Sequence, residues 1–323
     1  MPDNQLVQFL RERKAALLRE EEAQMQEMAR HWLQVERTLE ADMLRVADEL
    51  SRNQITSQAA AMQNERLQRL LWQARGETAR FNDWADGNIT RKQMELAAQG
   101  IDDATQALQM TISTYFDRLP VESLNAMFGF AADGSPLANL LRSNYGEAVN
   151  GLLDALLKGL TLGNHPTDIG RMMAEEFGIG LQRALTIART EQLRAYRAGS
   201  LEQYRNSGVT VRYKRMSARD ERVCAGCLFS DGMEFETDHD FDEHPNGRCT
   251  MVPVVDGAED MSVFESGQDW FRGIDPEMQQ SILGGSGFDA WKNGTSLDDL
   301  FQFVNDPTWG GKFIPAPVGK IGQ

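Results

Sequence analysis

A stripe of apolar side chains along residues 4–52 constrains the fold of this chain more than any other feature. Its members recur three or four positions apart, which is the spacing that places side chains on one face of an α-helix. They are Met25, Met28, Trp32, Val35, Leu39, Met43, Val46 and Leu50. Arg, Glu, Asp and Gln fill many of the positions between them. The pattern predicts one long amphipathic helix, which we expect to pack in a helical bundle rather than to form a free coiled coil.

Further helical patterns follow in the first half of the chain. We expect a second helix over residues 56–81 and a third that begins at a capping box formed by Thr90 and Gln93. Shorter helical pieces should cover residues 121–133 and 137–160. The first half of the chain is therefore predicted to be all-helical.

The middle of the chain changes from a helical to an alternating pattern at Gly208. Residues 165–207 are helical in pattern, with Gly178 as an expected stop within them. Beyond Gly208, apolar and polar residues alternate, which is typical of a strand with one covered face. We expect three short strands, over residues 209–217, 233–236 and 250–255. Pro253 cannot donate to a strand partner, so it predicts an edge position for the last strand.

The remaining residues return to helical patterns. We expect one helix to begin at Asp275 and to stop at Gly284. Another should begin at Ser296 and run through Val304. Residues 313–323, FIPAPVGKIGQ, have the pattern of an extended or mobile arm.

All three cysteines of the chain lie between residues 224 and 249, in the pattern C-x2-C-x16-H-x4-C. Two close pairs of soft ligands on two turns are typical of a tetrahedral Cys3His zinc site. The predicted ligands are Cys224, Cys227, His244 and Cys249. Four protein ligands leave no open coordination position, so the zinc would be structural and would stabilise a sheet with little core of its own.

Other interpretations of this segment stay open. The cysteines could be small buried side chains, with His244 hydrogen-bonded to the backbone, or a redox dithiol. His239 could replace His244 as a ligand. Asp238, Asp240 and Asp242 have the first spacings of a calcium loop, but the later positions of that motif are missing.

These patterns predict a mainly α fold with a small β element (α+β). A long-helix N-terminal bundle would be followed by a helix-plus-small-sheet domain with a structural zinc site, and then by a helical tail. The predicted domains are residues 1–164, 165–256 and 257–323.

The net charge of −15 opposes a protein whose whole surface binds nucleic acid, because phosphate binding requires Lys and Arg. A local basic strip could still contact DNA phosphates. The alternative interpretation is that these residues form a solvated face of a strand. The strip comprises Arg212, Lys214, Arg215, Arg219 and Arg222. No run approaches the roughly 20 apolar residues of a membrane span, and no signal core or cleavage site precedes the first helix. We therefore expect a protein kept in a cytoplasm or packed in a particle assembled there.

Several motifs of the second half resemble the phage head morphogenesis family, the Mu F-like minor head proteins. The motifs are Ile187-Ala188-Arg189-Thr190-Glu191, Arg194-Ala195-Tyr196-Arg197-Ala198-Gly199, Tyr204, Gly208-Val209, Asp220-x-Arg222-x-Cys224-x-x-Cys227, Asp231-Gly232, His244-Pro245-Asn246, Arg248-Cys249 and Val252-Pro253. The resemblance covers about residues 165–305, more weakly toward its end. The family commonly reads H-P-x-C-R-C, and this chain has Gly247 at the first of those two cysteines.

The resemblance implies a non-enzymatic minor structural head protein of a tailed phage or prophage. Such a protein would lie in the head interior of the virion, after assembly in the host cytoplasm. It would associate with the portal protein and with procapsid or scaffold components, and it would act in head assembly and in DNA packaging or delivery. Phage DNA is a further possible partner, and residues 1–164 would face the portal or the capsid.

Two other function classes compete with this one. A phage-delivered enzyme, either a nuclease or a toxin effector, would need open metal coordination, for which His239 and Asp240 are the nearby candidates. A free DNA-binding protein of the host conflicts with the net charge. Arg189 and Glu191 do not face each other on a helix, so we expect them to form separate ion pairs that anchor the helix to the sheet.

Overall fold

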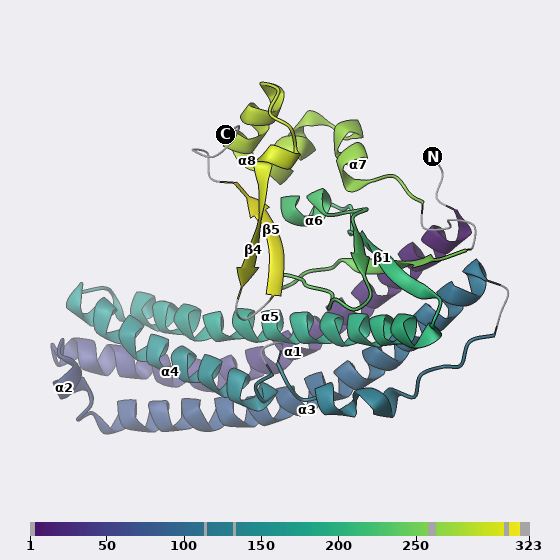
Figure 1. The fold of residues 1–323 in the computed structure, drawn as a ribbon. Coiled ribbons are helices and arrows are strands. Elements are labelled where there is room, and N and C mark those ends of the chain that lie inside the picture. Colours follow the sequence, from purple (N-terminus) through teal and green to yellow (C-terminus); the bar gives the residue numbers. More distant parts are fainter. Residues whose placement is uncertain (1–3, 113–114, 132–133, 258–262, 307–309, 317–323) are drawn as a thin grey trace. The chain divides into compact units, whose positions relative to one another are not determined.

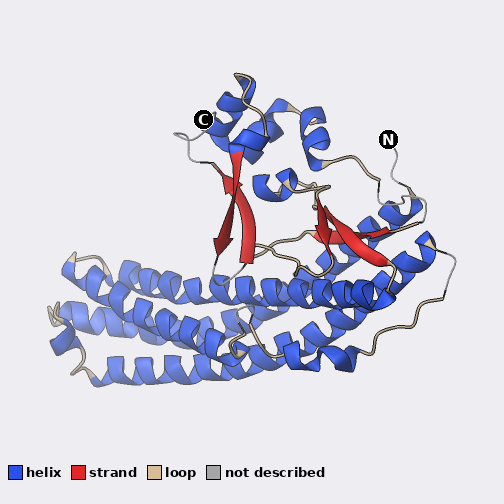
Figure 2. Ribbon diagram, viewed as in Figure 1, coloured by secondary structure: helices blue, strands red, loops and turns tan. Residues whose placement is uncertain are grey.

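The computed structural model describes residues 4–112, 115–131, 134–257, 263–306 and 310–316 (Figure 1). It is mainly α-helical with a small antiparallel sheet, which confirms the predicted fold class (Figure 2). The elements are α1 (Gln5–Arg52), α2 (Gln58–Ala61), α3 (Glu65–Thr111), η1 (Val121–Met127), α4 (Leu137–Thr161), α5 (Pro166–Ser207), β1 (Thr210–Met216), α6 (Ala225–Phe229), β2 (Glu234–Glu236), β3 (Thr250–Val255), α7 (Gly267–Gly273), α8 (Pro276–Lys292), η2 (Asp298–Leu300), β4 (Phe301–Asp306) and β5 (Gly310–Pro315). None of the described helices combines the length and the apolar character that crossing a bilayer requires.

The chain divides into two compact units. One, here called the helical unit, comprises residues 21–91 and 129–189. The other, here called the site unit, takes its residues from 1–20, 92–128 and 190–323. The long helices α1, α3 and α5 each contribute residues to both units. The predicted domain boundaries near residues 164 and 256 stay a prediction.

The helical unit is held together by the predicted apolar stripe of α1. All eight members of the stripe are buried, and they pack against α3, α4 and the first part of α5. Trp32 lies at the centre of an aromatic group, with ring centroids 5.1 Å from Phe81, 4.9 Å from Tyr145 and 4.8 Å from Phe177. Residues 5–52 contain neither Gly nor Pro, so nothing interrupts the backbone hydrogen bonds of α1. The predicted bundle is confirmed for this part of α1.

Two predicted helix ends in the long helices are wrong. α3 runs without a break from Glu65 to Thr111, through the expected gap after Phe81. Buried Ala85 and Ile89 continue the apolar stripe across that gap, and this tertiary packing overrides the capping signal. Likewise α5 continues through Gly178. The helical piece predicted over residues 121–133 is a 3-10 helix over residues 121–127, and residues 132 and 133 lie outside the described residues.

The site unit contains the predicted three-stranded sheet. The strand order is β2-β1-β3, and both pairings are antiparallel. Tyr213 on β1 lies opposite Phe235 on β2 and Pro253 on β3, so Pro253 occupies an edge strand as predicted. Buried Tyr213 packs with Leu201 and Tyr204 of α5, which joins the sheet to the end of that helix.

The predicted helix from Ser296 through Val304 is wrong. Ser296 does cap a turn, since its hydroxyl accepts from the Asp299 N–H at 3.1 Å, but the turn is the short η2. The chain then enters the β4–β5 hairpin, where Phe301 stacks on Phe229 of α6 with centroids 5.0 Å apart. Burial of this aromatic ring against α6 favours a strand over the helix that the local pattern predicted.

The expected stop at Gly284 is present as a break inside α8. Gly284 has φ of 70°, and helical structure resumes after it as far as Lys292. A positive φ is accessible to glycine without steric cost, which explains why the break falls there. Of the predicted arm, residues 313–315 belong to β5, and 317–323 lie outside the described residues.

Candidate metal centre

The second part of α5 fixes the loop that precedes β3. Arg197 is buried and donates from Nη1 to the carbonyl oxygens of Gly247 at 3.1 Å and Cys249 at 3.3 Å. Seven residues before Arg197 on the same helix, the Thr190 hydroxyl accepts from the backbone N–H of Asn246 at 3.1 Å. The loop over residues 246–249 is therefore attached to a helix at two points.

A close crossing of α3 and α5 positions this part of α5. A Cβ at Gly199 would lie 2.2 Å from the carbonyl oxygen of Ala97, and a Cβ at Gly100 would lie 2.1 Å from that of Tyr196. The Ser200 hydroxyl donates to the Gly100 carbonyl at 3.1 Å, and the Tyr196 hydroxyl donates to Asp103 at 2.9 Å. The two helices can approach this closely only because neither glycine carries a side chain.

Two of the cysteines come from the start of α6. Cys224 is the N-cap residue of this short helix, and its sulfur accepts from the Cys227 N–H at 3.3 Å. This turn directs both sulfurs toward His244, whose Nε2 lies 3.2 Å from Cys224 Sγ and 3.1 Å from Cys227 Sγ. These three side chains form a cluster in which every pair of ligand atoms lies within 4.8 Å.

The tautomer of His244 suits metal binding. Its Nδ1 lies 2.8 Å from the carbonyl oxygen of Pro245, which can only accept a hydrogen bond. Nδ1 therefore carries the proton, and Nε2 presents a lone pair to the two sulfurs. A histidine that binds a metal through one ring nitrogen usually donates a hydrogen bond from the other, often to a backbone carbonyl.

Cys249 joins the cluster through Cys227. The ligand atoms of Cys227, Glu243 and Cys249 also lie within 4.8 Å of one another, and all three residues are buried. The four predicted ligands therefore gather in two groups that share Cys227. Glu243 is an acidic group that the sequence did not single out, because it is the last of several acids in the loop before His244.

The donor set fits a soft divalent ion. In a tetrahedral zinc site, a thiolate sulfur and an imidazole nitrogen lie roughly 3.5 Å apart. The distances from His244 Nε2 to the two sulfurs are close to this value. Three thiols and one imidazole are ligands that zinc prefers, so these residues could hold a metal ion.

The thiols differ in acidity. The hydrogen bond with Cys227 lowers the pKa of Cys224. The side-chain hydrogen bond with Cys224 raises the pKa of Cys227 well above its ordinary value, and the bond with Cys227 together with burial does the same for Cys249. In the absence of an ion, the first thiolate therefore forms at Cys224, the exposed cysteine.

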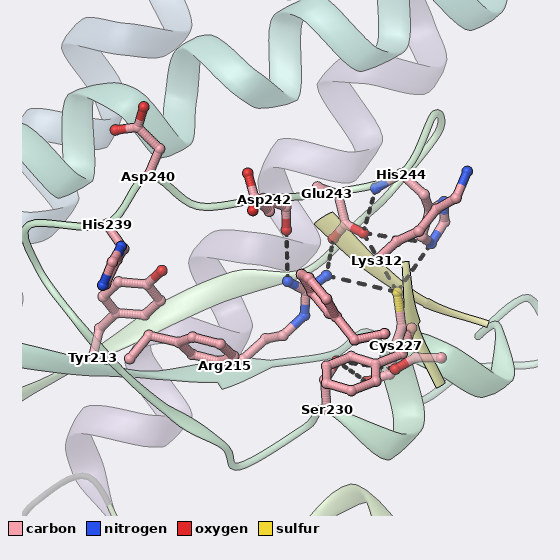
Figure 3. Close-up of a pocket in the computed structure, with 14 residues that line it drawn as sticks. Tyr213, Arg215, Cys227, Ser230, His239, Asp240, Asp242, Glu243, His244 and Lys312 are labelled. Atoms are coloured by element: carbon pink, nitrogen blue, oxygen red, sulfur yellow. Dashed lines mark hydrogen bonds and ion pairs between the residues drawn. The ribbon is translucent and has the colours of Figure 1, made fainter. Parts of the chain in front are cut away.

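Glu243 stays ionised although it is buried. Burial acts to raise its pKa, but Arg215 and Arg197 outweigh burial and lower the pKa to about 2. Arg215 approaches with Nη2 at 2.8 Å from Glu243 Oε2. Figure 3 shows this pair beside Cys227 and His244, at the wall of a pocket of ≈ 210 Å³.

The other acidic-loop candidates take no part in the cluster. His239 has a 75% exposed side chain and lies 3.7 Å from Asp238. Asp240 pairs with Arg205 at 3.1 Å. In Figure 3 both His239 and Asp240 lie across the pocket from Cys227. His244, rather than His239, is thus the histidine that the structure brings to the cysteines.

The predicted DNA-contact strip is largely engaged in ion pairs. Arg212 contacts Glu234 at 2.6 Å, and Lys214 contacts the same carboxylate at 3.5 Å. The other pairs are Arg215 with Glu243 at 2.8 Å and Arg219 with Asp231 at 2.7 Å. Arg222, the fifth member, is exposed. The strip does not form one open basic face.

Arg189 and Glu191 have separate partners, as predicted. Arg189 pairs with Glu21 and, at 3.4 Å, with Glu22, both on α1. Glu191 is fully buried and pairs with Arg194 on the same helix at 3.2 Å. The Arg189 pairs join α5 to α1 rather than to the sheet, which corrects the partner expected for Arg189, and the Glu191–Arg194 pair lies within α5.

Comparison with known proteins agrees with the motifs. Residues 150–252 match the family model described as phage Mu protein F like protein. No curated protein and no solved structure matches the chain. The matched residues include α5, strands β1 and β2, the start of β3 and all four predicted metal ligands. The resemblance predicted from the sequence is therefore confirmed over residues 150–252, which match the phage Mu F-like family model.

Proposed function

We propose that this protein is a minor structural head protein of a tailed phage or prophage. It would associate with the portal protein in the procapsid interior and act in head assembly and in DNA packaging or delivery. The observation that carries this proposal is the family match over residues 150–252. The family points to a phage head morphogenesis protein with a structural rather than an enzymatic role.

The long helices of the helical unit support a docking role. They form a bundle with its own core, and their outer faces are rich in charged side chains. Elongated helical surfaces of this kind are suited to binding other helical components. A pull-down of the full chain with the portal protein of the same phage tests this partner. Retention of the portal protein by beads that carry the chain is the expected result, and its absence at low and moderate salt contradicts the portal assignment.

A structural zinc ion is the second part of the proposal. Cys224, Cys227, His244 and Cys249 would hold it, and it would join α6 to the loop before β3. The ion would supply charge neutralisation for the buried thiolates and a cross-link between two turns. Because such a site is assembled only in the folded chain, its binding free energy contributes to folding, on the order of 10 kcal/mol.

Metal analysis of the purified chain tests the zinc assignment. We expect about one zinc per chain, with the C-terminal half unfolding on chelation. Cys224→Ser should lose the metal, whereas His239→Ala, at the exposed histidine outside the cluster, should keep it. A wild-type chain that is normally folded and free of metal would contradict this part of the proposal and leave the head-protein assignment intact.

DNA contact by the basic strip stays a prediction. Arg212, Lys214, Arg215 and Arg219 would have to exchange a carboxylate partner for phosphate, whereas Arg222 is exposed. A salt titration of DNA binding tests the strip, because each phosphate contact adds to the slope of affinity against salt. A slope that Arg222→Ala leaves unchanged argues against a contact at this residue.

A further inference from the structure

Glu243 touches both ligands of the second turn. Its Oε1 accepts from the backbone N–H of His244 at 3.0 Å and lies 3.6 Å from the sulfur of Cys227. Its Oε2 accepts from the backbone N–H of Cys249 at 3.3 Å. One carboxylate thus spans the two chain segments that carry His244 and Cys249, and it faces Cys227 of the first turn.

The Glu243 side chain also fills the space above Gly247. A Cβ at residue 247 would lie 2.0 Å from Cγ of Glu243, 2.2 Å from Cδ and 2.5 Å from Oε1. Gly247 does not have a positive φ, so its backbone conformation alone does not call for glycine. The requirement for glycine at this position comes from the neighbouring carboxylate.

The Arg215 guanidinium pairs with the carboxylate, and the buried Arg197 guanidinium holds the loop beside it. Arg215 of β1 pairs with Oε2 at 2.8 Å, and Arg197 of α5 bonds the carbonyl groups of Gly247 and Cys249. Glu243 is only 6% exposed, so its position is fixed by these contacts rather than by solvent. Side chains that orient the ligands of a metal in this way have an effect on affinity of about 10–100-fold.

We propose that Glu243 is a positioning residue of the metal centre, which orients His244 and Cys249 and thereby requires glycine at position 247. This inference rests on the proposed zinc site. It assigns Glu243 a role through the ligands and not as a ligand, because the proposed ligands Cys224, Cys227, His244 and Cys249 would by themselves make up a tetrahedral set. Both carboxylate oxygens are also occupied, one by the His244 N–H and the other by Arg215 and the Cys249 N–H.

Four variants of the full chain test the proposal: Glu243→Gln, Glu243→Ala, Gly247→Ala and the double variant Glu243→Ala/Gly247→Ala. Asp242→Asn is the matched control, since it removes one carboxylate charge from the adjacent, exposed side chain. Zinc affinity is measured by competition with a chromophoric chelator. The cobalt-substituted chain reports the number of thiolate ligands by its charge-transfer absorption, and denaturation of the metal-free chain reports stability.

We expect Glu243→Gln and Gly247→Ala to weaken zinc binding about 10–100-fold while three thiolates remain bound. Asp242→Asn should change affinity less than twofold. In the Glu243→Ala chain, the additional change Gly247→Ala should not lower zinc affinity any further, because the side chain that a Cβ at residue 247 would overlap is then gone. This double-variant comparison remains decisive if Glu243→Gln folds poorly.

Three results overturn the inference. Unchanged zinc affinity and cobalt absorption in Glu243→Gln, with lower stability of the metal-free chain alone, would show a merely structural role. If Glu243→Gln loses the metal completely and the wild-type metal centre has an oxygen ligand, Glu243 is itself a ligand. If Gly247→Ala weakens zinc binding equally in the wild-type chain and in the Glu243→Ala chain, the two residues do not act through each other. A wild-type chain that binds no zinc refutes the metal centre itself, which is a distinguishable outcome.

Discussion

The crossing of α3 and α5 offers the sharpest test of how this fold builds its site. Gly199→Ala places a methyl group 2.2 Å from the carbonyl oxygen of Ala97 and 3.0 Å from its carbonyl carbon. Both atoms belong to the backbone of α3, so no side-chain rotation can relieve the overlap. The helices must move apart, and the contacts made at the crossing must lengthen.

The expected cost follows from these contacts. Overpacking at a rigid position costs roughly 3 kcal/mol, the upper end of the usual range. The hydrogen bonds from Ser200 to Gly100 and from Tyr196 to Asp103, at 3.1 and 2.9 Å, contribute about 1 kcal/mol each when they are lost. Alanine gains about 1 kcal/mol over glycine in a helix. The net loss of unfolding free energy is about 4 kcal/mol if both bonds break.

Urea denaturation followed by circular dichroism measures this loss. Gly87→Ala is the matched control, since Gly87 also lies inside α3 and a Cβ there meets nothing within 4 Å. The control should be stabilised by up to about 1 kcal/mol. Because Arg197 lies two residues before Gly199, the Gly199→Ala variant should also bind zinc more weakly. Equal stability of the two alanine variants would refute the close crossing.

Two further predictions concern single residues of the site unit. A Cβ at Gly226 would lie 2.1 Å from the carbonyl oxygen of Phe313, so Gly226→Ala should loosen the β4–β5 hairpin by about 1–3 kcal/mol. Hydrogen exchange of the hairpin amides should then be about tenfold faster or more, and unchanged exchange would contradict the contact. Burial lowers the pKa of Lys14 from 10.5 to about 8, so the unfolded chain binds more protons at Lys14 between these values. Stability should therefore rise with pH across this interval by about 3 kcal/mol more in the wild type than in Lys14→Met. Parallel pH profiles of the two chains in denaturant titrations would show that Lys14 is not buried.

Much of the fold could be predicted from periodicity. The α1 stripe and the three strands of the sheet depend on local spacing, which directly reflects which faces are covered. The errors arise where packing outweighs a local signal. The capping box at Thr90 lies inside α3 because the stripe through Ala85 and Ile89 continues past it, and Phe301 forms a strand because its ring packs on Phe229.

The candidate site divides in the same way. The identity of its four ligands could be read from the sequence, because cysteine and histidine on two turns are chemically distinctive in a chain with only three cysteines. The role of Glu243 could not, because an acidic residue in an acidic loop carries no local signal. Its contacts with Arg215 on β1 and with residue 247 exist only once distant segments have come together.

The sequence by itself determined the long helices, the small sheet and the chemical nature of the ligands, because helix and strand periods and thiol chemistry are properties of neighbouring residues. Tertiary structure alone decided how closely α3 and α5 cross at Gly100 and Gly199, and which buried charges surround the ligands. Those outcomes depend on atoms from segments far apart in the chain occupying the same small volume, and no local pattern encodes that distance.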